Sequence, residues 1–143
     1  VDGYLWSSPD TIAGLRFKAI INGKEQLIKG DNPIISDAEP GKLLVTWPLE
    51  TIKGSLKMRF TEKQIEISLV GNDFIKWFLE LNTCDVIKLP FTVVNQNQID
   101  AMFEGMKYFI TAKKGSFSKP GTGSVFRIAP GMNSIILDLG GKD

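Results

Sequence analysis

The sequence contains no histidine, and this absence removes several kinds of active site. Histidine is the commonest general base and a usual zinc ligand, and the Ser-His and Cys-His nucleophile pairs depend on it. The single cysteine, Cys84, cannot form an internal disulfide or a thiolate zinc site, and no histidine is present to activate it. We therefore expect no metal site, no cofactor and no catalysis of these types.

Long apolar runs and a strong net charge are also absent. The 143 residues carry a formal net charge of +1, which creates no strong field toward nucleic acid or an anionic membrane. The longest apolar run, "FIKWFLEL", is interrupted by Lys76 and Glu80 and is too short to cross a bilayer. We expect no nucleic-acid partner, no membrane insertion, and one globular domain over residues 1–143.

Alternation of apolar and polar residues dominates what is present. In "LKMRFTEKQIEISL" (56–69), a fold about Glu62-Lys63 places Arg59 opposite Glu66 on a polar side. The other side is apolar and consists of three opposed pairs: Phe60 with Ile65, Met58 with Ile67, and Leu56 with Leu69. This pattern predicts an antiparallel hairpin with one face in water.

Two more hairpins are predicted in the same way. A fold about Glu104-Gly105 in "IDAMFEGMKYFI" (99–110) opposes Ile99 to Ile110. A helix is the alternative there, because Ala, Met and Glu favour helices, but Gly105 at the centre favours strands. Asn22-Gly23 is a strong hairpin signal between two apolar segments.

Further strands are expected at 43–47, 74–82, 86–94, 124–129 and 134–139, separated by glycine- and proline-containing segments. "FIKWFLELN" is apolar on both sides, with Phe74 and Phe78 on one and Trp77 on the other, so we expect a central strand. The chain therefore predicts an all-β fold, an antiparallel β-sandwich of about ten strands.

The segment "KKGSFSKPGTGSVF" (113–126) raises the question of phosphate binding. A P-loop needs G-x-x-x-x-G-K-[ST] followed by a helix, whereas this segment lacks the motif and leads into a strand. We expect 113–123 to be an exposed, mobile connection between two strands. If it binds anything, Lys114 and Lys119 are expected to contact an acidic glycan weakly, within an anion-contacting set that also includes Lys113 and Arg127.

Aromatic and acidic residues supply the other candidate sites. Trp47, Trp6 and Tyr4 are candidates for stacking on a sugar ring, with burial as the competing interpretation. The segment from Asp31 to Glu39 gathers oxygen ligands suited to calcium, but acidic residues in a turn-rich segment are mostly solvated turn formers, and that interpretation is favoured. Two carboxylates suffice for glycoside hydrolysis, but no spacing selects a pair, and Glu80 and Asp138 within apolar strands are expected to pair with Lys or Arg.

The strand rhythm of "FLELNTCDVIKLPF", "GMKYFITAKKG" and "GSVFRIAPGMNSIILDL" resembles the β-sandwich accessory modules of large bacterial polysaccharide-degrading enzymes. The resemblance implies a non-catalytic module of a larger carbohydrate-active or cell-envelope protein, located in the periplasm or outside the cell. Its partners would be a polysaccharide or a neighbouring catalytic domain of the same chain. A start at Val1 rather than Met predicts a domain cut from a longer protein. A structural or interaction domain without a ligand is the alternative, and a carboxylate-dependent glycosidase the third possibility.

Overall fold

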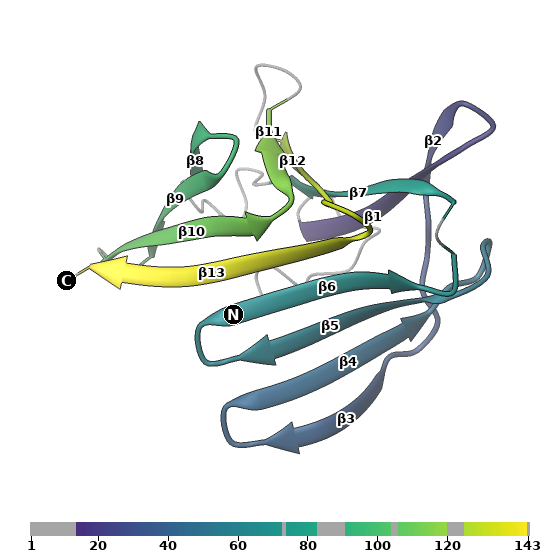
Figure 1. The fold of residues 1–143 in the computed structure, drawn as a ribbon, viewed down its shortest axis with the longest axis horizontal. Helices are drawn as coiled ribbons and strands as arrows, with labels where there is room; N and C mark the ends of the chain where they lie inside the picture. Colours follow the sequence, from purple (N-terminus) through teal and green to yellow (C-terminus); the bar gives the residue numbers. More distant parts are fainter. Residues whose placement is uncertain (1–13, 73, 83–90, 104–105, 120–124, 143) are drawn as a thin grey trace.

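The computed structural model describes residues 14–72, 74–82, 91–103, 106–119 and 125–142, and this part of the chain is all-β. Five strands belong to a smaller sheet: β1 (Gly14–Ile21), β2 (Lys24–Leu27), β7 (Lys76–Asn82), β11 (Ser116–Ser118) and β12 (Val125–Ala129). Eight belong to a larger sheet: β3 (Ile34–Glu39), β4 (Lys42–Pro48), β5 (Ser55–Thr61), β6 (Gln64–Val70), β8 (Phe91–Asn95), β9 (Gln98–Phe103), β10 (Met106–Lys114) and β13 (Ser134–Lys142). The expected antiparallel β-sandwich is confirmed, with thirteen described strands in place of about ten (Figure 1).

The predicted hairpins form in the predicted registers. Phe60 lies opposite Ile65 and Arg59 opposite Glu66 in β5–β6, and Ile99 lies opposite Ile110 in β9–β10. The strand interpretation of 99–110 is therefore confirmed over the helical one. Asn22 and Gly23 both have positive φ (52° and 78°), the backbone of the two-residue turn that twists with its strands.

The two sheets enclose one apolar core, because alternate residues of nearly every strand point inward. Ile135 has no exposed surface, and Leu79 and Ile99 are each 1% exposed. The smaller sheet contributes Phe17, Ala19, Trp77, Leu79, Phe117, Phe126 and Ile128; the larger sheet contributes Leu56, Met58, Ile65, Ile67, Leu69, Ile99, Ala112, Ile135 and Leu137.

β7 is the central strand of the smaller sheet, as expected, and Trp77 and Phe78 are buried. Phe74 is an exception, because β7 begins at Lys76 and the Phe74 side chain is 98% exposed. The prediction that Phe74 shares a covered face with Phe78 is therefore wrong. The segment before Lys76 turns away from the sheet, so the apolar run in the sequence begins two residues before the strand does.

Two other boundaries differ from expectation. Residues 34–39, interpreted as part of an acidic turn-rich segment, form β3 at one edge of the larger sheet. The strand expected at 86–94 is described from Phe91 to Asn95 as β8, and residues 83–90 lie outside the described part of the chain.

The chain changes sheets within the segment predicted to be a mobile connection. Lys113 and Lys114 belong to β10 in the larger sheet, and Ser116–Ser118 form β11 in the smaller one. Phe117 is 3% exposed and its N–H donates to the carbonyl of Gln96 at 2.7 Å. The prediction of a simple exposed connection is therefore wrong for 113–118, and Gly115 alone links the two strands.

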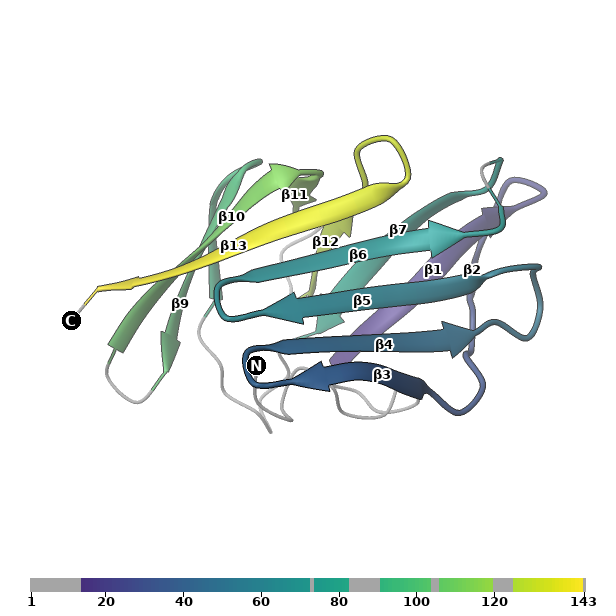
Figure 2. The same cartoon turned by 60° about the horizontal axis from the view of Figure 1, so that its bottom comes forward.

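The larger sheet consists of two meanders joined by a strand from elsewhere in the sequence. Strands β3 to β6 form the first meander, and β8 to β10 form the second. β13 lies between them, antiparallel to β6 on one side and to β10 on the other (Figure 2). The sheet is continuous only because β13 occupies this seam.

Candidate functional site

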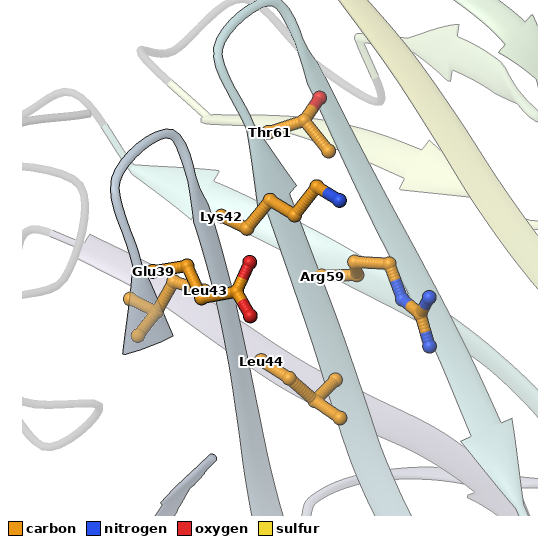
Figure 3. Close-up of a pocket in the computed structure, with 6 residues that line it drawn as sticks. All are labelled: Glu39, Lys42, Leu43, Leu44, Arg59 and Thr61. Carbon is orange, nitrogen blue, oxygen red and sulfur yellow. The ribbon is translucent and has the colours of Figure 1, made fainter. Parts of the chain in front are cut away.

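The outer side of the larger sheet, the side away from the core, carries the candidate site. Val45 and Met58 are buried, so the alternate positions on β4 and β5, among them Lys42 and Arg59, point outward. We call this surface the polar face. Near the β3 edge it contains an open hollow of about 260 Å³, lined by Glu39, Lys42, Leu43, Leu44, Arg59 and Thr61 (Figure 3).

The strand register brings the charged groups of this hollow together. Glu39 lies opposite Lys42 across β3–β4, Lys42 lies opposite Thr61 across β4–β5, and Arg59 is two residues before Thr61. Diagonal neighbours of this kind are about 7–8 Å apart in a sheet, which is within reach of long side chains. Figure 3 shows the Lys42 amine and the Arg59 guanidinium on either side of open space.

Neither cation of the hollow forms an ion pair with a described residue, although Glu39 lines the same hollow opposite Lys42. Arg59 lies opposite Glu66, as predicted, but the ion pairs found in the described part of the chain involve neither side chain. Lys42 likewise has no ion pair there. Two exposed, unpaired cations beside a hydroxyl favour an anionic ligand over a neutral one.

A row of polar side chains continues from the hollow across the polar face. Successive strand pairings place Lys42, Thr61, Gln64, Asp138, Thr111 and Gln98 side by side on six neighbouring strands. The Gln64 amide donates to Asp138 Oδ1 at 2.9 Å, and Lys113 Nζ lies 3.0 Å from Asp138 Oδ2. The row therefore offers both donors and acceptors over most of the width of the sheet.

The pKa of Asp138 is lowered below its usual value, first by the hydrogen bond from Gln64 and then by Lys113. The ionised carboxylate therefore stabilises the fold above the ordinary pKa of 3.8, and this contribution is lost as the pH falls through the lowered value. Asp138→Asn is expected to lower stability at neutral pH, and this loss is expected to shrink as the pH falls through the lowered pKa of Asp138. Urea unfolding at neutral pH and at an acid pH well below 3.8 measures this difference.

Gln64→Ala serves as the companion variant, because it removes the larger cause of the lowered pKa and leaves the carboxylate. It is expected to reduce the acid sensitivity of the wild type without abolishing it. The same loss of stability for Asp138→Asn at both pH values would contradict the assignment.

The aromatic residues singled out from the sequence do not meet at this site. Trp47 lies opposite buried Leu56, is half-buried and packs against the core. A side chain at Gly30 would start 3.0 Å from the Trp47 Cβ, so glycine leaves the room that the Trp47 side chain occupies. Tyr4 and Trp6 lie outside the described residues.

The predicted set of cations is divided between two surfaces. Lys113 lies on the polar face beside Asp138, and Lys114 lies at a bulge between β10 and β13, against Gly131. Lys119 is exposed just after β11. Arg127 is on the smaller sheet, where it forms ion pairs with Glu25 and Glu80, so the structure does not bring it together with Lys113.

The acidic candidates are similarly dispersed. Glu80 is 6% exposed and pairs with Lys18 at 3.1 Å, as expected for a buried acid. It belongs to the smaller sheet and Asp138 to the polar face of the larger one, so they do not form a carboxylate pair. Among the residues whose placement is described, no group of three or more Asp, Glu or Cys side chains could hold a metal ion, and Cys84 and the Asp37 side chain lie outside that set.

Sequence reasoning missed Lys42 and left Arg59 as one half of a surface charge pair. The two residues belong to different hairpins, and their proximity follows from the β4–β5 pairing, whose register no local pattern predicts. A pairing prediction extended from the β5–β6 hairpin to its neighbour would have found them.

Within the described residues, no helix has the length and apolar character that a membrane span requires. Comparison of the chain with protein-family models, with curated proteins and with solved structures finds no match.

Proposed function

We propose that this chain is a non-catalytic β-sandwich module that contacts an acidic glycan through the polar face. The observation that supports this proposal is that an open hollow holds two cations, Lys42 and Arg59, neither of which forms an ion pair with a described residue. A sugar acid presents a carboxylate for these cations and hydroxyl groups for the adjoining row of polar side chains. The resemblance to accessory modules of polysaccharide-degrading enzymes points to the same ligand class, and to a larger carbohydrate-active or cell-envelope protein as its setting.

The site suits binding better than catalysis. Its cations and hydroxyl lie on an open sheet surface, and the described residues that line the hollow include one carboxylate, Glu39, and no buried nucleophile. Exposed charge pairs contribute about 1 kcal/mol or less each, so the expected affinity is modest and sensitive to salt. A module that concentrates an enzyme on its polymer needs no tighter contact, because several weak contacts along one chain combine.

Calorimetric titration of an oligouronate against wild type and Lys42→Gln/Arg59→Gln tests the proposal. The double variant is expected to bind about tenfold more weakly, because each exposed charge pair supplies up to about 1 kcal/mol. A neutral oligosaccharide of equal length is expected to bind both proteins more weakly than the oligouronate binds wild type.

The matched control is Lys24→Gln/Lys53→Gln, which removes two exposed positive charges that do not line the hollow. Lys24 is on β2 of the smaller sheet, and Lys53 is in the β4–β5 connection, at the opposite end of those strands from Lys42 and Thr61. A third variant, Lys114→Gln/Lys119→Gln, separates the polar face from the site predicted at those lysines. Equal affinities for wild type and Lys42→Gln/Arg59→Gln would rule out the hollow as the binding site.

A docking domain without a small ligand is the second candidate function, and one observation favours it. Ile34 and Ile35 on the edge strand β3 are 58% and 62% exposed, although adjacent residues of a strand point to opposite faces. An edge strand with exposed apolar groups on both faces is a template for pairing with another chain. Absence of glycan binding together with concentration-dependent self-association would favour this alternative.

A further inference from the structure

Two large apolar side chains project into solvent at one end of the sandwich. Phe74, in the connection from β6 to β7, is 98% exposed, and Met132, in the turn from β12 to β13, is 92% exposed. Figure 2 shows both connections at the same end of the molecule. Val70, the last residue of β6, is 42% exposed and adds to this surface, which we call the apolar tip.

The backbone at Met132 is the more informative part of the apolar tip. Met132 and Asn133 have φ values of 51° and 69°, and Gly131 and Ser134 exchange backbone hydrogen bonds across them. The same two-residue turn in the β1–β2 hairpin is made by Asn22 and Gly23, which tolerate positive φ. Met132 therefore occupies a position where a long side chain is strained, and its apolar side chain is exposed to water there.

Hydrogen bonds hold the apolar tip in place. The Asn133 amide donates to the Leu69 carbonyl at 3.0 Å, and its Oδ1 accepts from Trp77 Nε1 at 2.6 Å. This one side chain ties the Met132 turn to the end of β6 and to β7, the strand that follows Phe74. The projecting groups are thus carried on braced connections, which reduces the ordering needed for binding.

We propose that the apolar tip inserts Phe74 and Met132 into the interfacial region of a lipid bilayer. A stable protein interface buries about 800 Å² on each partner, far more than a few side chains on separate connections supply. A bilayer interface adapts its shape around projecting groups and requires only buried apolar area. The sequence predicts no inserted segment, and none is needed, because only side chains enter the lipid.

Charge on the apolar tip is nearly balanced. Residues 70–76 contain one lysine and one aspartate, residues 130–134 contain no charged group, and Lys114 lies against Gly131 beside the Met132 turn. Electrostatic attraction to anionic headgroups therefore contributes little, and binding is expected to depend on apolar contact. We therefore expect the protein to bind zwitterionic and anionic bilayers with similar affinity, at low and at high salt.

Co-sedimentation with phosphatidylcholine vesicles, with and without phosphatidylserine, tests the proposal at high lipid concentration. Wild type is expected to bind weakly to both, and Phe74→Ser to bind about tenfold less, given the free energy of burying one large apolar side chain. Val94→Ser is the matched control, because Val94 is 50% exposed in β8, outside the apolar tip. It is expected to bind as wild type does.

Met132→Asn provides a second, independent readout. It is expected to weaken vesicle binding about tenfold and to raise the melting temperature by about 3 °C, because asparagine tolerates positive φ. A merely structural Met132 would not give opposite changes in binding and stability. Three results would each overturn the proposal: no vesicle binding by the wild type, binding by Phe74→Ser as strong as that of the wild type, or wild-type binding confined to anionic vesicles at low salt. The first result would leave a protein partner as the occupant.

Discussion

Gly115→Ala is expected to lower the free energy of unfolding by about 3 kcal/mol or more, from a strained backbone together with a steric clash. Gly115 has φ of 106°, which side chains rarely tolerate, and an added Cβ would lie 2.6 Å from the Ala129 carbonyl oxygen. That oxygen belongs to the backbone of β12, so relief requires a strand to move. Urea unfolding with a common slope measures the change.

Gly23→Ala is the matched control for this prediction. Gly23 also has positive φ (78°), but no atom lies within 4 Å of the position its Cβ would take. It is expected to cost about 1 kcal/mol, the backbone contribution alone. Equal losses for the two variants would mean that the β10–β11 crossing moves freely to accept a side chain.

Glu80→Ala is expected to destabilise the protein by about 2–3 kcal/mol, below the usual cost of breaking a buried ion pair because its partners are partly exposed. The Glu80 side chain is 8% exposed; its oxygens lie 3.1 Å from Lys18 Nζ and 3.4 Å from Arg127 Nε. Arg127 also lies over the Phe78 ring, 4.5 Å from its centre. Removing the carboxylate leaves these cations close together without the anion between them.

Glu25→Ala separates burial from simple loss of charge, because Glu25 contacts the same Arg127. Both Glu25 oxygens accept from the Arg127 guanidinium, at 3.1 and 3.2 Å, but the Glu25 side chain is 43% exposed. Its removal is expected to cost about 0.5–1 kcal/mol and to matter less at high salt. A loss for Glu80→Ala no greater than that for Glu25→Ala would refute a special role for the buried acid.

Sequence patterns predicted the elements whose two faces differ. The register of β5 and β6 follows from alternation, because a shift of one residue would turn Met58 and Ile67 to water. The Asn22-Gly23 turn follows from local backbone preference. In both cases the information lies within a few neighbouring residues.

Elements shaped by distant contacts were missed or misplaced. β11 has three residues, with Phe117 as its one apolar group. It forms because it pairs with β12 and because the Phe117 N–H donates to the carbonyl of Gln96. β3 has adjacent isoleucines instead of an alternating pattern, because neither face of this edge is fully covered. Phe74 extends an apolar run without being buried, and composition alone does not distinguish these cases.

The candidate site was only partly accessible from the sequence for a related reason. A binding surface on a sheet is assembled across strands, so its members recur at no fixed spacing. The sequence drew attention to Asp138 and Lys113 separately. Their contact with each other and with Gln64 depends on the pairing of β13 with both β6 and β10. Trp47 drew attention as an aromatic residue, whereas its position opposite Leu56 places it against the core.

The seam filled by β13 has a consequence for the order of folding. Each meander of the larger sheet is built from sequence neighbours and can form early, since local pairings have a low loop-closure cost. β13 follows all the other described strands in the chain, so during synthesis the two meanders remain separate until its residues leave the ribosome. Before then, the inner edges of β6 and β10 are open to pairing with other chains. The pairing of β13 with β6 and β10 is therefore expected to be a slow step of folding, and the chain is prone to aggregation until this step is complete.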